Sequence, residues 1–225
     1  MKNKLLIALL TSLSVLFGAA TVSAVTVSGG LSLAYGQADG SGSENVNGSV
    51  ESESTEAEFA MPSLFLEVQL DAGAITPSIG LDFVPIAGES DTVENARTDA
   101  GDTAETTDSG TNKVSMDFEN MITIYALLPI GDTGAYAKAG YTSMDVIIND
   151  KLEATGGNYD DEEADGYSVA LGFQREGIGP FDFMRAEVGH TSFDQISQVN
   201  RNTSDISIKM DLEATYAKIS FGKNF

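Results

Sequence analysis

The chain has 225 residues, 34 acidic and 12 basic side chains, a formal net charge of -22, and no cysteine. The lack of cysteine excludes disulfide frameworks, thiolate metal sites and cysteine nucleophiles. The charge argues against a nucleic-acid partner, because phosphate binding needs clustered lysine and arginine. With 23 glycines, 5 prolines and 20% charged residues, the composition favours strands and turns over helices.

The first 24 residues have the pattern of a secretory signal peptide. Lys2 and Lys4 precede an apolar stretch over residues 5–17, and small residues precede the expected cleavage site after Ala24. A helix over this stretch would cover only about 20 Å, which is too short for a hydrocarbon core of about 30 Å. We therefore expect residues 1–24 to be removed on export, and residues 25–225 to form one mature domain.

Eight segments of the mature domain alternate apolar and polar residues with a period of two, which is typical of a strand with one apolar face. In one of them, for example, Leu64, Leu66 and Val68 alternate with Phe65 and Glu67. The segments cover residues 25–35, 63–70, 75–83, 121–128, 137–141, 167–174, 184–189 and 217–225.

The connections between these segments alternate in length. Short turns with glycine are expected at residues 71–74, 129–134 and 175–180, and long polar loops at 36–58, 87–113 and 149–165, with a shorter one near 197–204. The three long loops hold six, seven and seven of the 34 acids, and residues 89–110 have the composition of a disordered segment. This sorting predicts an all-β fold, an eight-stranded antiparallel up-and-down transmembrane β-barrel with both ends on the periplasmic side.

The last strand has an irregular pattern. Apolar residues occupy even positions from Ile206 to Ala214, but odd positions from Ala217 to Phe225. A bulge near Thr215, with the first half of the strand projecting above the lipid, accounts for both patterns. A different register of this strand accounts for them equally well.

Several segments resemble outer membrane β-barrels of the OmpA/OmpX type. Residues 127–132 (LLPIGD) with 136–141 (YAKAGY) resemble the central hairpin of that family, 184–188 (MRAEV) its seventh strand, and 216–225 (YAKISFGKNF) its last strand. The resemblance implies an eight-stranded barrel in the Gram-negative outer membrane, exported through the periplasm. It also implies that Phe221 and Phe225 form the signal for the barrel assembly machinery. It implies no single function, because such barrels serve as anchors, adhesins, pores and enzymes.

Seven charged residues fall on positions that should face the barrel interior. The lumen of an eight-stranded barrel is just wide enough to be filled by side chains, and buried charges need partners. These residues therefore predict a structural plug of salt bridges, with a gated polar path as the alternative. They are Glu67, Asp82, Glu119, Lys138, Arg185, Glu187 and Lys218.

No secure catalytic or metal-binding set is present. His190 and Ser192 are spaced like the base and nucleophile of outer membrane lipid A deacylases, but Phe193 stands where that pattern expects Asn, and the sequence reveals no orienting acid. The acidic run 158–165 fails the EF-hand frame, because Glu163 occupies the place of the turn glycine. We expect no catalytic residue, no metal site and no cofactor, with weak divalent-cation binding at the loops.

The sequence thus predicts an integral outer membrane barrel with a structural or surface-interaction role, displaying acidic extracellular loops. The expected partners are outer membrane lipid, lipopolysaccharide and the assembly machinery, and the expected state is a monomer. Two alternatives are a narrow pore for ions or small solutes, and a lipid A hydrolase that uses His190 and Ser192.

Overall fold

A computed structural model describes residues 25–46, 49–71, 75–89, 93–100, 107–152, 159–200 and 206–225. The expected signal peptide lies outside these residues. The strands are β1 (Val25–Val46), β2 (Ser49–Leu70), β3 (Ser78–Glu89), β4 (Val93–Ala100), β5 (Thr107–Pro129), β6 (Ala135–Leu152), β7 (Glu162–Ile178), β8 (Phe181–Phe193), β9 (Ile196–Val199) and β10 (Ile206–Asn224).

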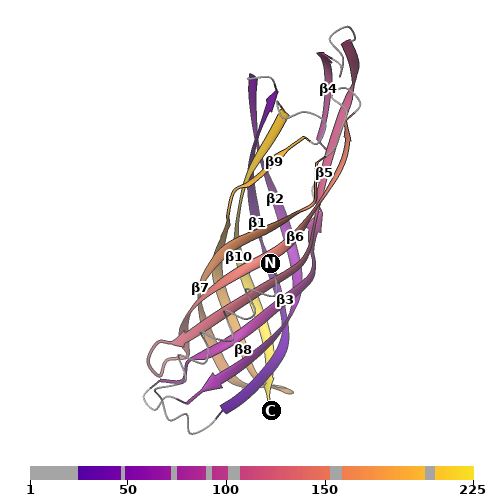
Figure 1. Ribbon diagram of the computed structural model, residues 1–225. Helices are drawn as coiled ribbons and strands as arrows, with labels where there is room; N and C mark the ends of the chain where they lie inside the picture. The colour runs from indigo at the N-terminus through magenta and orange to yellow at the C-terminus, as the bar shows by residue number, and fades with distance from the viewer. Residues whose placement is uncertain are drawn as a thin grey trace.

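Eight of these strands close into an antiparallel up-and-down barrel. Within the described ranges the ring runs β1, β2, β3, β5, β6, β7, β8, β10, and β10 pairs back to β1 (Figure 1). The two short strands lie beside this ring, because β4 pairs with β5 and β9 pairs with β10. The predicted fold class is confirmed.

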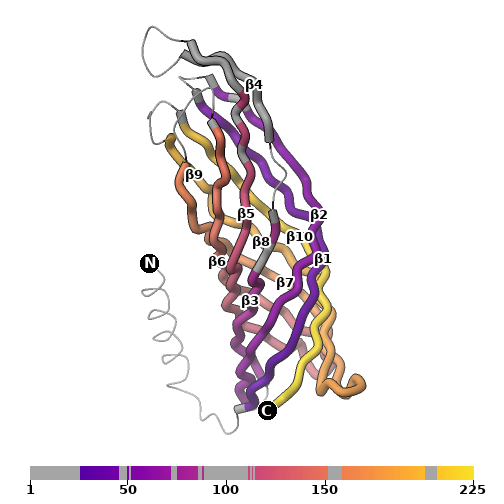
Figure 2. Tube along the Cα trace, turned by 90° about the vertical axis from the view of Figure 1, so that its right-hand side faces the viewer, coloured from indigo at the N-terminus to yellow at the C-terminus, as the bar shows by residue number. Residues whose placement is uncertain are grey.

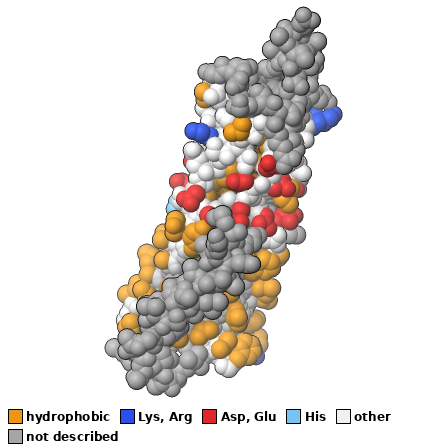
Figure 3. All heavy atoms as spheres, in the orientation of Figure 1, with side chains coloured by type: hydrophobic (Ala, Val, Ile, Leu, Met, Phe, Trp, Pro, Cys, Tyr) orange, Lys and Arg blue, Asp and Glu red, His pale blue; other side chains and the backbone are white. Residues whose placement is uncertain are grey.

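The lower part of the barrel has the surface of a membrane protein. Hydrophobic side chains cover its exterior, and Asp and Glu gather directly above them (Figure 3). Outward leucines and valines are largely exposed, with Leu31 at 59%, Leu171 at 61% and Val188 at 63%. Below, we call the strand residues from the Phe225 end up to this acidic level the membrane part, and the strand residues beyond it the outer part.

Tyrosines and acids mark the upper boundary of the membrane part. Tyr35 and Tyr167 are 57% and 64% exposed, and the Tyr141 and Tyr167 rings lie 5.4 Å apart. Such aromatic girdles lie at the interfaces of membrane barrels. Just above them, carboxylates occupy outward strand positions that we call the acidic belt: Glu58, Glu119, Asp145, Asp165 and Glu213.

The long polar loops that we expected are largely strands. β1 continues through Gly36 to Val46, and β2 already begins at Ser49 (Figure 2). Each has 22 residues, about 70 Å at about 3.3 Å per residue, which exceeds the hydrocarbon core more than twofold. The prediction was wrong because both faces of these extensions are polar, so the alternation that identifies a strand is absent.

The segment with a disordered composition is also partly in strands. Within residues 89–110, β4 pairs with the beginning of β5 from Val93↔Val114 to Ala100↔Thr107. For its described residues, the expectation of a disordered loop is therefore wrong. A hairpin satisfies its own backbone hydrogen bonds, and polar composition does not prevent it from forming.

No bulge interrupts β10 against β1. The register runs without a shift from Ser28↔Asn224 to Val46↔Ile206, so the alternative of a bulge near Thr215 is wrong. Even-numbered residues point inward along the whole strand. Met210 and Leu212 pack inside the outer part, whereas Lys218 and Ser220 lie in the lumen of the membrane part. The apolar pattern inverts because the exterior changes from lipid to water.

The inward apolar residues of the outer part form one hydrophobic core. They come from β5 to β10, with Tyr159 just before β7. The buried members are Met144, Val146, Ile148, Tyr159, Ala164, Phe193 and Ile196, with Met116, Phe118, Met121, Ile208, Met210 and Leu212 packed against them.

A bulge does interrupt β5. The register to β6 shifts between Glu119 and Ile122, and Asn120 has a φ of 52°. Phe118 and Met121 consequently both pack inward, and Glu119 takes an outward position opposite Asp145. The expectation that Glu119 faces the lumen is wrong, because one extra residue moves every side chain beyond it to the other face.

We predict that Leu171→Arg lowers barrel stability far more than Glu163→Arg. Both residues point outward from β7, but Leu171 lies in the apolar band and Glu163 in the outer part. An arginine that faces the bilayer midplane lowers barrel stability by about 2–4 kcal/mol, whereas an arginine that faces water has little effect. Denaturant midpoints of both variants refolded into lipid vesicles measure the difference. Equal midpoints would contradict the placement of the lipid.

Candidate functional site

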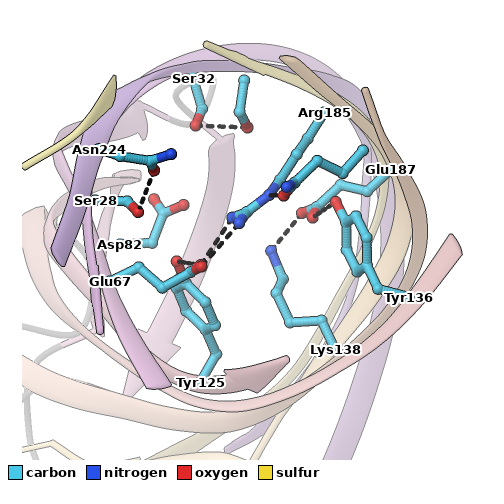
Figure 4. Close-up of polar contacts among 12 residues, drawn as sticks. Ser28, Ser32, Glu67, Asp82, Tyr125, Tyr136, Lys138, Arg185, Glu187 and Asn224 are labelled. Carbon is cyan, nitrogen blue, oxygen red and sulfur yellow. Dashed lines mark hydrogen bonds and ion pairs between the residues drawn. The ribbon is translucent and has the colours of Figure 1, made fainter. Parts of the chain in front are cut away.

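The candidate site is the polar lumen of the membrane part. It exists because lipid occupies the outside of these strands, so their charged and hydroxyl side chains take the inward positions. Glu67 comes from β2, Lys138 from β6, and Arg185 with Glu187 from β8. Figure 4 shows these side chains pointing toward one another across the barrel.

Arg185 and Glu67 form the central contact. The two guanidinium Nη atoms donate to the two carboxylate oxygens, each at 2.7 Å, and both side chains are more than nine-tenths buried. The Arg185 Nε donates to Gln174 Oε1 at 2.6 Å, and the Tyr125 hydroxyl donates to Glu67 Oε2 at 3.0 Å. The Phe183 ring lies 4.6 Å from the guanidinium carbon. This bidentate, stacked geometry is the strongest available to an arginine.

Two further ion pairs flank this contact. Glu187 accepts hydrogen bonds from the Lys138 ammonium and from the Tyr136 hydroxyl, the latter at 2.9 Å. Lys218 donates to Asp82 Oδ2 at 2.7 Å. Among the described residues, these three ion pairs join three carboxylates of the lumen to three cations.

Hydroxyl and amide pairs extend the network toward both ends. Ser28 donates to Asn224 Oδ1 at 2.8 Å, Ser32 donates to Ser220 Oγ at 2.8 Å, and the Thr123 and Thr142 hydroxyls lie 2.9 Å apart. Buried polar groups in a narrow lumen are costly unless they are hydrogen-bonded, so these contacts reduce the cost of burying the hydroxyls.

Glycines on neighbouring strands make room for the tyrosines of the lumen. A Cβ atom on Gly80 would lie 2.4 Å from the Tyr125 ring, and one on Gly172 would lie 2.3 Å from the Tyr136 ring. Each ring lies flat across the adjacent strand at a glycine, and its hydroxyl reaches a carboxylate. The glycines are therefore part of the site.

The sequence anticipated most of this network. Six of the seven expected lumen residues come together in the three ion pairs, and only Glu119 lies elsewhere. The sequence did not indicate Gln174, Tyr125 and Tyr136, which add hydrogen bonds to Arg185, Glu67 and Glu187. The two tyrosines could have been found from one sequence pattern, because each lies on an inward position opposite a glycine of the neighbouring strand.

The expected assembly residues lie at the base of the barrel. The Phe221 ring packs 5.1 Å from the Phe181 ring, and Phe225 is 83% exposed. Both therefore lie near the lower edge of the apolar band.

His190 and Ser192 point outward from β8, next to β10. The His190 Nδ1 lies 3.0 Å from the Thr215 hydroxyl, and its Nε2 lies 4.0 Å from a Glu213 carboxylate oxygen. Glu213 is the acid that the sequence did not reveal, and it pairs with Ser192 in register. These residues lie between two continuous ladders, in which the backbone amides of the described strands pair with the neighbouring strands and are not free to face an oxyanion.

Two features are absent from the described part of the chain. It contains no group of three His, Asp or Glu side chains arranged to hold a metal ion. It also contains no helix that is both long and apolar enough to cross a membrane.

The chain's likeness to known proteins lies in three-dimensional structure. No protein-family model and no curated protein matches it. Among solved structures, it is similar to the outer membrane protein OprG from Pseudomonas aeruginosa, with 12% identity, a TM-score of 0.46, and 90% of this chain and 96% of that chain covered.

Two other structures are similar over comparable lengths. Ail of Yersinia pestis has 8% identity and a TM-score of 0.31, covering 85% of this chain and 98% of that chain. The outer membrane protease OmpT from Escherichia coli has 11% identity and a TM-score of 0.35, covering 91% and 98%. The chain's own strand ladders show a closed antiparallel β-barrel. The likeness extends to the fold alone, and none of these structures is OmpA or OmpX.

We predict that Arg185→Met is strongly destabilising, and that adding Glu67→Gln recovers much of the loss. The single variant leaves a carboxylate buried without its cation, which costs about 3–5 kcal/mol, whereas the double variant removes both charges. Urea midpoints of the single and double variants give the coupling, with the exposed Lys223→Met as control. Additive effects of the two substitutions would show that the pair is not coupled.

Proposed function

We propose that this protein is a closed barrel of the Gram-negative outer membrane whose role is surface interaction, and that it is neither a solute pore nor an enzyme. The membrane part anchors the chain, and the outer part carries the strands that meet partners. The observation that carries this proposal is the lumen, where three ion pairs neutralise one another inside the barrel. Figure 4 shows two of them, Arg185 with Glu67 and Lys138 with Glu187.

The alternative of a narrow pore is less well supported. An ion crossing the lumen would have to separate a buried pair, such as Arg185 and Glu67, or shed its own water beside one. Barrels that conduct water freely are larger, with about 16 strands, and leave a channel between their side chains.

The alternative of a lipid A hydrolase has one observation in its favour, the position of Glu213 beside His190. The hydroxyl that His190 contacts is that of Thr215 and not that of Ser192. Without oxyanion donors this arrangement would lack the largest usual contribution to acyl transfer. We therefore propose that His190, Thr215 and Glu213 form a structural contact at the membrane interface.

The surface role draws further support from the charge of the outer part. The acidic belt lies level with the lipid headgroups, where it repels anionic lipopolysaccharide unless divalent cations bridge the two. Lipid, lipopolysaccharide and such cations are accordingly the proposed neighbours of a monomeric barrel. The assembly machinery that recognises Phe221 and Phe225 is its proposed partner during insertion.

Conductance in planar bilayers tests the closed lumen. We expect no channel steps from the native protein, and steps from a variant in which Glu67, Lys138, Arg185 and Glu187 are all alanine. This variant leaves the net charge unchanged but replaces the four side chains of two ion pairs by methyl groups. Regular steps from the native protein would favour the pore.

Surface labelling tests location and orientation. Because the chain has no cysteine, single substitutions report one position each. We expect a membrane-impermeant maleimide to label Ser52→Cys, in the outer part, on intact cells, and to label Thr133→Cys, in the short β5–β6 turn, only after the outer membrane is permeabilised. The reverse pattern would show the opposite orientation, and no labelling of either on intact cells would place the barrel elsewhere.

A further inference from the structure

One strand of the outer part has an unpaired edge. β2 pairs with β1 along its whole length, from Val25↔Leu70 to Val46↔Ser49. Its ladder with β3 covers only Leu64↔Phe83 to Gln69↔Ser78. Among the described residues, the other edge of β2 therefore has no strand partner from residue 49 to residue 63.

Two prolines explain where the β2–β3 ladder stops. Leu70 donates to the Pro77 carbonyl at 2.9 Å, so even-numbered residues of β2 direct their amides toward β3. Beyond Leu64↔Phe83, the next rung of this kind would join Pro62 to Pro85. Proline has no amide hydrogen, so this rung loses both of its hydrogen bonds.

The freed edge is accessible. Residues 52–58 of β2 are all exposed, although alternate side chains point to opposite faces of the strand. By the same alternation, the amides and carbonyls of Ser52, Ser54, Glu56 and Glu58 lie along the open edge. We call the backbone of residues 50–60 on this side the β2 edge.

The charge around the β2 edge indicates which kind of strand could pair with it. The hairpin of β1 and β2 contains no lysine or arginine, and four glutamates lie in the upper half of β2: Glu51, Glu53, Glu56 and Glu58. Two copies of this edge would repel each other, because like charges opposite one another in a ladder are destabilising. A strand of opposite charge would be attracted.

We propose that the β2 edge binds an extended lysine- or arginine-rich peptide segment of another protein, which adds a strand to the sheet formed by β9, β10, β1 and β2. Backbone hydrogen bonds supply the alignment, and the glutamates supply the preference for positive charge. This inference rests on the proposed surface role and names the partner of the outer part.

The experiment uses the full-length mature barrel in zwitterionic lipid nanodiscs. The probe is a fluorescent, capped ten-residue peptide of alternating lysine and threonine, and binding is followed by anisotropy. The control peptide has the same charge, but its amides are methylated on one edge. We expect the control to bind about tenfold more weakly, because several backbone hydrogen bonds are lost.

Variants of the barrel locate the site. Ser54→Pro removes one amide from the β2 edge and leaves the bonds to β1, and we expect it to weaken binding about tenfold, whereas Ser54→Ala binds as the native protein does. Glu53→Gln with Glu56→Gln should weaken binding and reduce its dependence on salt. Pro62→Thr with Pro85→Thr should lengthen the β2–β3 ladder and also reduce binding. Heat-modifiable migration checks that each variant is folded.

Two outcomes would overturn the inference. Equal binding of both peptides, or unchanged binding by Ser54→Pro, would show attraction by charge without strand addition. No binding by the folded native barrel would show that the glutamates only keep the edge from pairing with other copies. Neither outcome bears on location or conductance, so failure here is distinguishable from failure of the proposed surface role.

Discussion

Every long strand of this protein passes from lipid into water, and the rest of the structure depends on that change of solvent. In lipid, apolar side chains belong outside and charges inside, whereas in water the preference reverses. β10 meets both demands by changing its composition while it keeps one register. β5 meets them with a bulge at Asn120, which also turns Glu119 outward. β2 and β3 instead stop pairing at Pro62 and Pro85, close to the same level.

The polar lumen follows from the same constraint. With lipid outside, the membrane part can hold ionised groups only in its interior, where a single unpaired charge is prohibitively costly. The result is a neutral set of pairs in which Arg185 holds Glu67 with both Nη atoms and Lys138 contacts Glu187. Tyrosine hydroxyls donate further hydrogen bonds to these carboxylates, and their rings need glycine at the neighbouring strand, as at Gly80. The ion pairs, the tyrosine hydrogen bonds and the packing of the rings against glycine therefore depend on one another.

The sequence predicted the membrane part well because lipid on one face and a polar lumen on the other impose strict alternation. It therefore placed Lys138, Arg185 and their partners correctly on the inner face. It failed where that alternation carries no information. Residues 36–46 and 49–58 are polar on both faces and look like loops, although they form strands. A one-residue bulge, which moved Glu119, has no reliable signature in composition. Gln174 is missing from the predicted site because an uncharged side chain gives no electrostatic reason to expect a partner.

The outer part does not need to close as the membrane part does. An open edge in lipid would leave backbone groups unsatisfied, but in water the solvent supplies their hydrogen bonds. The barrel can therefore end one ladder at its upper boundary, and two opposed prolines are sufficient to do so. An open edge still carries the hazard of pairing with other copies, and a hairpin without a single cation removes that hazard by repulsion. The same charge leaves the edge open to a strand of opposite sign, so the feature that protects the surface also determines what can bind to it.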